Sequence, residues 1–206
     1  YYYVSDKEKA ICLTIADMGY VGALSISVID FIKPWQVTNS SVFLFPMGKL
    51  AMPRSSEIGD CSWKNGKVEM SFFNDGNVRR LKGIYPNVDK KGLNVSWDIV
   101  LSDIPKESMV IATPFDKKGY FYLNQKINCM KAEGYFTLGE EVKVFSPVDS
   151  LATLDWGRGV WTYDNTWYWG SLQTRLEGGK TFGWNIGYGF GNTQSASEDM
   201  LFYDGK

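Results

Sequence analysis

Runs of β-branched and aromatic residues recur along the chain about every ten residues, with turn-forming residues between them. The run Tyr20–Phe31 is typical, because Leu24, Ile26 and Val28 alternate with small or polar residues. Such alternation places apolar side chains on one face of a half-buried strand. We find no segment with the periodicity of a helix. The pattern predicts an all-β fold of antiparallel strands, as in a barrel or sandwich.

The turns between these runs support antiparallel pairing. Asn65-Gly66 stands between two β-type runs, and this dipeptide favours a type I′ hairpin turn. Glu177–Lys180 is a second hairpin turn, and it joins the strands predicted over 166–176 and 181–189. Near the middle of the chain we predict two strands, Gly119–Asn128 and Met130–Leu138, interrupted at Cys129.

Charge and composition exclude several classes of function. The 206 residues are 44% hydrophobic, which is enough for a real core, and the net charge is −1. A neutral chain has no electrostatic attraction for nucleic acid or for an anionic membrane surface. There is no apolar run long enough for membrane insertion, and no signal peptide is visible. The absence of histidine excludes His-based triads and HExxH zinc sites, and we predict neither a metal nor a cofactor.

Three cysteines, Cys12, Cys61 and Cys129, lie far apart in the sequence and form no CxxC pair. An odd count without close spacing favours buried, reduced thiols and therefore a cytoplasmic location. The chain begins at Tyr1 without Met and ends at Lys206 in what resembles a hairpin tip, so we expect a fragment of a longer protein. The sequence carries no indication of oligomeric state.

The stretch from Ser150 to Asn192 combines aromatic rings, glycines and charges more densely than a strand requires. It contains five of the eight tryptophans and nine of the 21 glycines. Asp155 and Arg158 lie among those rings. Many apolar surfaces beside a few polar groups are typical of a small-molecule site.

Asp155 and Arg158 admit two interpretations. In the first, Asp155 is a carboxylate in an aromatic pocket, balanced by Arg158, where apolar walls raise its pKa and make it a proton donor. In the second, the two residues form a structural ion pair, or Arg158 stacks on Trp156 or Trp161. Both interpretations stay open at the level of sequence.

The tryptophans are interpreted either as the wall of a ligand site or as barrel core. Trp167 and Trp169 are two positions apart and are predicted to share one strand face, with Asn165 or Asn185 accepting an indole N–H bond. The segment QKINC supplies further polar groups, which line a cavity or lie on a wet face. The predicted ligand-binding residues are Trp156, Arg158, Trp161, Trp167, Trp169, Asn185, Gln125 and Asn128, with Asp155 as the candidate catalytic residue.

Three blocks carry a resemblance to a known family. They are QKINCMKAEG at 125–134, LDWGRGVWTYDNTWYWGS at 154–171 and EDMLFYDGK at 198–206, with LTIADMGYVG at 13–22 as a weaker match. Together they resemble an uncharacterised family of bacterial and fungal proteins known as a domain of unknown function. More remotely, the order of the aspartate–tryptophan–glycine tract, the Trp-rich strand and the Gly-turn hairpin is similar to carotenoid 1,2-hydratase-like, lipocalin-like proteins of the calycin group.

The remote resemblance implies two lipocalin-like antiparallel β-barrels. The first would occupy residues 1–149 without its beginning, and the second would start at residue 150 and continue past residue 206. These relatives include isoprenoid hydratases and pericyclic cyclases, and they carry histidine in the tract where this chain has Arg158.

Three hypotheses of function follow. In the first, the chain binds a small hydrophobic or amphipathic molecule against its tryptophans. In the second, it is a hydratase- or cyclase-like enzyme that uses Asp155 as an acid on an isoprenoid or polyene. In the third, the DWGRGVW tract holds two barrels together without a ligand. The sequence therefore leaves open whether the protein is an enzyme.

Overall fold

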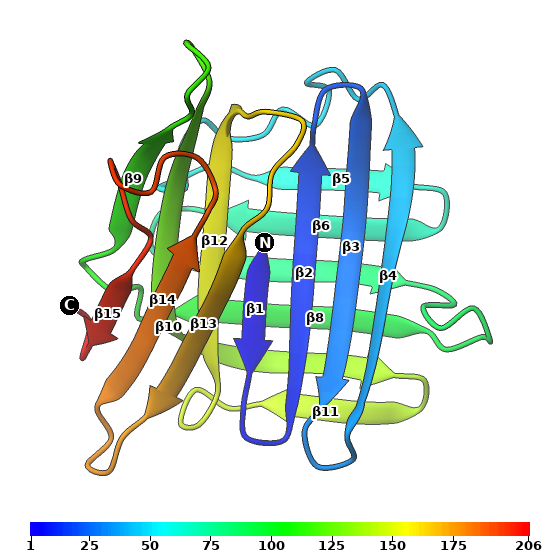
Figure 1. The fold of residues 1–206 in the computed structure, drawn as a ribbon. Helices are drawn as coiled ribbons and strands as arrows, with labels where there is room; N and C mark the ends of the chain where they lie inside the picture. Colours follow the sequence, from blue (N-terminus) through cyan, green and yellow to red (C-terminus); the bar gives the residue numbers. More distant parts are fainter. The chain divides into compact units, whose positions relative to one another are not determined.

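The computed structural model describes residues 1–206 and contains fifteen β-strands and no helix (Figure 1). The prediction of an all-β antiparallel fold is confirmed, since every pairing with a described register is antiparallel. No helix is available to cross a membrane. The strands are β1 (Tyr2–Ser5), β2 (Lys9–Asp17), β3 (Val21–Asp30), β4 (Trp35–Leu44), β5 (Cys61–Asn65), β6 (Val68–Asn74), β7 (Arg79–Tyr85), β8 (Val95–Ser102), β9 (Met109–Pro114), β10 (Phe121–Leu138), β11 (Glu141–Phe145), β12 (Leu151–Val160), β13 (Tyr168–Arg175), β14 (Thr181–Tyr188) and β15 (Met200–Tyr203).

The chain forms two compact units, and each contains two separate segments. Unit 1 consists of residues 1–103 and 131–152, and unit 2 consists of residues 104–130 and 153–206. One passage between the units falls between Ala152 and Thr153, close to the predicted boundary after residue 149. Residues 104–130 also belong to unit 2, and the predicted domains 1–149 and 150–206 did not include this exchange. These two domains stay a prediction.

Unit 1 contains two antiparallel meanders. Strands β1 to β4 pair in chain order, and so do β5 to β8, with the second half of β10 joining β8 to β11. Figure 1 shows the first meander lying across the second, so that the inner faces of the two layers meet. The alternation predicted for β3 is confirmed, because Leu24, Ile26 and Val28 are buried.

The interior of unit 1 is filled by its own side chains. Trp97, Leu13, Ile26, Met70 and Ile99 come from both layers, and each is at most 2% exposed. Burying such side chains stabilises a fold by about 1.5–3 kcal/mol each. Unit 1 therefore has a packed apolar core.

The predicted hairpin at Asn65-Gly66 is present, but its turn lies one residue later than predicted. Asn65 pairs with Val68 as the last residue of β5, so Gly66 and Lys67 form the two-residue loop. Gly66 has φ of +60°. A glycine at the first central position is the requirement of a type II′ turn, whereas the type I′ turn would have needed Asn65 in the loop.

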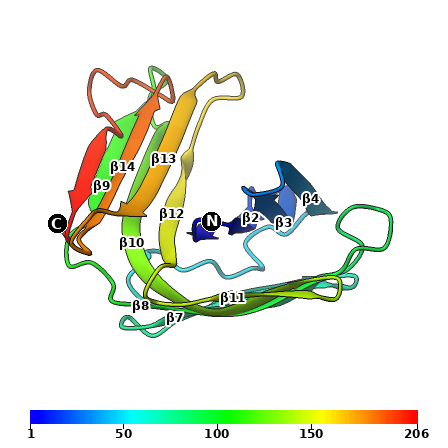
Figure 2. The same cartoon turned by 90° about the horizontal axis from the view of Figure 1, so that it is seen from below.

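Unit 2 also has two layers. Strands β13, β14 and β15 form a three-stranded antiparallel sheet, and β9 pairs with the first half of β10. Figures 1 and 2 show β13 and β14 lying over β10 and the second half of β12. The layer that faces β13 and β14 is therefore built mainly from residues 121–130 and 153–160.

The two strands predicted around Cys129 form one continuous strand of 18 residues, β10. Cys129 nevertheless marks an irregularity, because its φ is +64°, which a non-glycine residue seldom adopts. The irregular residue lies next to the point where β10 passes from unit 2 to unit 1, between Met130 and Lys131. The interruption in the sequence pattern was thus a local backbone distortion and not the end of a strand.

Burial makes two of the three thiols unreactive. Desolvation raises the pKa of Cys61 and of Cys129 from the ordinary value of 9.0 to about 11, while Cys12 is only half-buried. We expect iodoacetamide at pH 8 to alkylate Cys12 first, and Cys61 and Cys129 only when urea unfolds the protein, as measured by peptide mass spectrometry. The raised pKa also makes stability depend on pH. Because the folded pKa of Cys61 and Cys129 is raised, their contribution to the free energy of unfolding is complete below pH 9 and is lost as pH rises through about 11. Rapid alkylation of native Cys129 would contradict this prediction.

Candidate functional site

Strand β10 presents a row of polar side chains to the inside of unit 2. Tyr122, Asn124, Lys126 and Asn128 are spaced two apart, so they share one face of the strand. Asn124, Lys126 and Asn128 are at most 2% exposed, and Tyr122 is half-buried. Burying so many polar groups is costly unless they are paired, which makes this face the most unusual feature of unit 2.

Lys126 stands at the centre of a charged cluster. Its ammonium group forms ion pairs with the carboxylates of Asp155 and Glu198, the latter at 3.4 Å, and lies 5.2 Å from the ring centroid of Trp169. The side chains of Lys126, Asp155 and Glu198 are 2%, 13% and 11% exposed. One positive and two negative formal charges give this Lys126 cluster a net charge of −1. The two carboxylates compensate the buried ammonium group.

Glycines and backbone contacts hold the two carboxylates in place. Asp155 lies on β12, and a side chain at Gly157, two residues further on the same face, would collide with the ring of Tyr122. Glu198 belongs to the loop before β15, and its carbonyl oxygen accepts a 2.8 Å bond from Nδ2 of Asn185. A loop residue is thereby tied to the buried face of β14.

A hydrogen bond to Asn185, one of the two predicted acceptors, orients the indole of Trp169. Its Nε1 donates to Oδ1 of Asn185 at 2.9 Å, across the β13–β14 pair. The ring is 39% exposed, so one part of it contacts the Lys126 cluster while another part faces solvent. An aromatic face beside an ammonium group is also an attractive electrostatic contact.

A cluster of five aromatic rings adjoins the polar face. Phe190 is its centre, and the centroids of Phe115, Tyr122, Trp161 and Trp167 lie 5.3, 5.0, 5.9 and 5.2 Å from that of Phe190. All four contacts are edge-to-face, which is a favoured aromatic geometry. We name these five residues the Phe190 cluster. Trp161 and Trp167 are 42% and 56% exposed, so the cluster offers apolar surface to solvent.

Two glycines allow the chain to present Phe190. Gly189 and Gly191 have φ of +95° and +75°, and a Cβ at Gly191 would lie 2.9 Å from the carbonyl oxygen of Pro114. The glycine-rich sequence GYGFGN therefore serves as a tight bend around one aromatic side chain.

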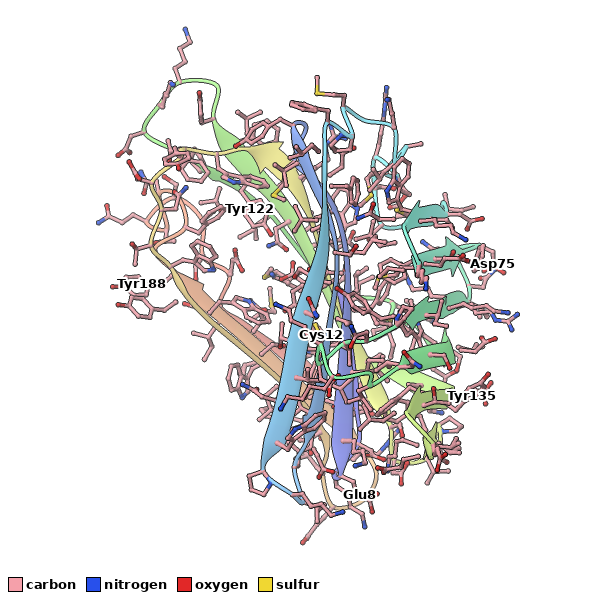
Figure 3. The ribbon with its side chains drawn as sticks, turned by 90° about the vertical axis from the view of Figure 1, so that its right-hand side faces the viewer. Glu8, Cys12, Asp75, Tyr122, Tyr135 and Tyr188 are labelled. Atoms are coloured by element: carbon pink, nitrogen blue, oxygen red, sulfur yellow. The ribbon has the colours of Figure 1, made fainter.

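Tyr122 belongs both to the Phe190 cluster, through its ring, and to the polar face of β10, where it lies two residues before Asn124. Figure 3 shows Tyr122 on the inner side of unit 2 and Tyr188 at the outer surface. Burial raises the pKa of Tyr122 well above its ordinary value of 10.0, and the negative charges of Asp155 and Glu198 raise it further. Tyr122 therefore keeps its proton at neutral pH and can act as a hydrogen-bond donor.

The side-chain amide of Asn124 has no hydrogen-bond partner, although the residue is 0% exposed. Both Oδ1 and Nδ2 are buried and unpaired. The hydroxyl of Tyr122 is near enough to Asn124 to offset part of the rise in the Tyr122 pKa, but the two groups do not have hydrogen-bond geometry. Buried amides without partners are rare, because each unmade bond costs about 1–3 kcal/mol.

The other residues predicted from sequence lie around this site or away from it. Arg158 is exposed on β12 and, three positions from Asp155, projects to the opposite face, while Trp156 is half-buried. Gln125 also lies on the opposite face of β10 from Lys126 and donates to Oγ of Ser108 at 2.8 Å. Asn128 is on the polar face and donates to the carbonyl of Leu172 at 3.2 Å. Trp167 precedes β13 and so does not share a strand face with Trp169.

Sequence reasoning missed the residues at the centre of the site. Lys126, Asn124, Tyr122, Glu198 and Phe190 were not among the predicted ligands. A signal did exist for three of them, because Tyr122, Asn124 and Lys126 alternate with Leu123, Gln125 and Ile127 in a predicted strand. For Glu198 and Phe190 there was none, since only the fold brings these loop residues to β10.

Unit 2 therefore combines the apolar rings of the Phe190 cluster, the unpaired amide of Asn124 and the charged Lys126 cluster. Asp155 and Glu198 are acceptors, Tyr122 is a donor, and Lys126 is occupied by its two carboxylates. No group of three or more cysteine, aspartate or glutamate side chains is placed to hold a metal ion.

Comparisons with known proteins agree with this fold. The crystal structure of kievitone hydratase from Nectria haematococca matches with a TM-score of 0.55 and 12% sequence identity. The match covers 98% of this chain but 59% of the hydratase chain, so this chain spans about three-fifths of that protein's length. At this identity the likeness shows the fold alone, and it confirms the prediction of a lipocalin-like, antiparallel all-β structure.

A search of curated proteins finds no match. A family model covers residues 1–206, without singling out the DWGRGVW block. The chain therefore belongs to the family described as "Domain of unknown function (DUF2804)".

Proposed function

We propose that unit 2 binds a small amphipathic molecule, with its apolar part against the Phe190 cluster and its polar end at the polar face of β10. The observation that carries the proposal is the juxtaposition of partly exposed aromatic rings with a buried row of polar groups, joined by Tyr122. Small-molecule sites combine apolar walls with a few well-placed polar groups in this manner.

Ligand capture tests the proposal directly. The protein is incubated with a total lipid extract, separated from unbound material, and analysed by native mass spectrometry. We expect a bound small molecule, and recovery of protein without any adduct would contradict the proposal.

A titration with the neutral fluorescent dye Nile red tests the position of the site. Phe190→Ala removes the ring that the other four rings contact, so we expect binding to weaken about tenfold, as for the loss of a central aromatic anchor. Tyr188→Ala is the matched control, because Tyr188 is an exposed ring of unit 2 whose contact is with Tyr168. Equal affinities of both variants and the original protein would place any binding elsewhere.

The second candidate is a hydratase-like reaction at the same site. It is favoured by the presence of Asp155 and Glu198 beside aromatic rings, which attract cationic intermediates, in a chain whose fold is similar to that of a hydratase. In this reaction one carboxylic acid would protonate an alkene of an isoprenoid or polyene, and a carboxylate would accept a proton from the attacking water. Incubation with kievitone, analysed for a product heavier by one water, is the first test. Turnover that persists in Asp155→Asn would exclude Asp155 as the acid.

A further inference from the structure

The buried amide of Asn124 restricts which chemical group can form the polar end of the ligand. This inference rests on the proposed function. Asn124 has an unpaired acceptor, Oδ1, and an unpaired donor, Nδ2, and it is 0% exposed. The two other nearly buried side chains of the polar face have partners: Lys126 has its carboxylates, and Asn128 has the carbonyl oxygen of Leu172. Among the nearly buried side chains of this face, the unpaired polar atoms therefore belong to one amide.

The charge of the surroundings restricts what can pair with this amide. Asn124 lies two residues from Lys126, whose cluster has a net charge of −1, and both carboxylates act on the neighbouring Tyr122. A ligand carboxylate would add a negative charge beside two existing ones and could not donate to Oδ1. A ligand ammonium group could donate to Oδ1 but would leave Nδ2 unpaired. A neutral hydroxyl both donates and accepts.

We propose that Asn124 is the specificity-determining residue of this site, and that it selects ligands with an uncharged hydroxyl group, as in an alcohol or a phenol. The hydroxyl donates to Oδ1 and accepts from Nδ2, which satisfies both unpaired atoms. The Tyr122 ring, two residues away on the same strand, is half-buried and belongs to the Phe190 cluster, whose tryptophans are partly exposed.

A series of probes with one apolar part and different ends tests the selectivity. Cinnamyl alcohol, cinnamate, cinnamylamine and β-methylstyrene share a phenylpropenyl group and present a hydroxyl, a carboxylate, an ammonium and a methyl group. By equilibrium dialysis at pH 7 we expect the alcohol to bind about tenfold more tightly than each of the others, since it alone gains both hydrogen bonds. Equal or tighter binding of cinnamate or cinnamylamine would overturn the inference.

The variant Asn124→Leu tests the residue itself. Leucine has a similar size and needs no hydrogen bond, so the melting temperature should stay the same or rise, while the preference for the alcohol over β-methylstyrene disappears. Asn74→Leu is the control, because Asn74 is a buried asparagine of unit 1 that donates to the carbonyl of Ser56 at 3.0 Å. It should lower the melting temperature and leave the preference for the alcohol unchanged.

The outcomes separate this inference from the proposed function. If β-methylstyrene and the alcohol bind equally to the original protein, the site exists but the role of Asn124 is wrong. If Asn124→Leu lowers the melting temperature and leaves alcohol binding intact, Asn124 is a structural residue and the inference fails. If no probe binds, the proposed function fails together with the inference.

Discussion

Replacing Lys126 by methionine is expected to lower the free energy of unfolding by about 3–5 kcal/mol. The substitution keeps the length and the apolar stem of the side chain but removes the ammonium group that Asp155 and Glu198 share. Two nearly buried carboxylates would then lie close together without a counter-charge. Urea unfolding followed by tryptophan fluorescence measures this change, because Trp156, Trp161, Trp167, Trp169 and Trp184 all belong to unit 2.

Lys131→Met is the matched control for this prediction. Lys131 lies on the same strand, but its ion pair with Asp103 at 2.5 Å is exposed, with side chains 41% and 64% accessible. Exposed pairs contribute less than about 1 kcal/mol. The double variant Lys126→Met with Asp155→Asn should recover part of the loss, since it removes one uncompensated charge. Equal effects of the two lysine substitutions would show that the buried cluster has no special energetic role.

Replacing Gly134 by alanine is the second change with a large expected effect, a loss of about 4 kcal/mol. Gly134 lies on β10 between Ile99 and Phe145 in unit 1, with φ of +124°, where a residue with a side chain is strained by about 1–3 kcal/mol. A Cβ would also collide with the carbonyl oxygen of Asp98 and would lie 2.9 Å from Cα of Ile99. Backbone atoms cannot move aside as a flexible side chain can, so a further cost of overpacking is added.

Gly19→Ala separates the two contributions to that loss. Gly19 also has positive φ, +81°, but no heavy atom lies within 4 Å of its Cβ position. Only the conformational cost applies, about 1–2 kcal/mol. Melting curves of both variants, recorded by circular dichroism, provide the comparison. If Gly134→Ala is no more harmful than Gly19→Ala, the close approach of β8 and β10 is not a constraint on the fold.

The fold class could be read from the sequence because its determinants are local. The alternation in Tyr20–Phe31 and the turn chemistry at Asn65-Gly66 act over a few residues, and they produced the predicted strand and a hairpin whose turn lies one residue later than predicted. The errors were local as well. The strand break predicted at Cys129 became a single left-handed residue inside β10, because pairing on both sides of it continues the strand.

The candidate site was only partly predictable, since its members come from distant segments. Asn165 or Asn185 was predicted to accept a tryptophan N–H, and in the structure Asn185 accepts that of Trp169, across the β13–β14 pair. Arg158, three residues away, was one predicted partner of Asp155, and the structure gives Asp155 an ion pair with Lys126, 29 residues earlier in the chain. The pairing of Asp155 with Lys126 depends on which strands lie side by side, and local sequence does not specify this.

The sequence alone determined that the chain forms antiparallel strands, because side-chain periodicity and turn residues specify backbone conformation locally. It also determined that the stretch from Ser150 to Asn192 would concentrate aromatic rings near polar groups. Only the tertiary structure decided which polar groups these are. Lys126, Glu198 and Asn124 are ordinary in sequence, and they become a buried, charged and partly unsatisfied site because strand β10 and the loop before β15 meet inside one unit.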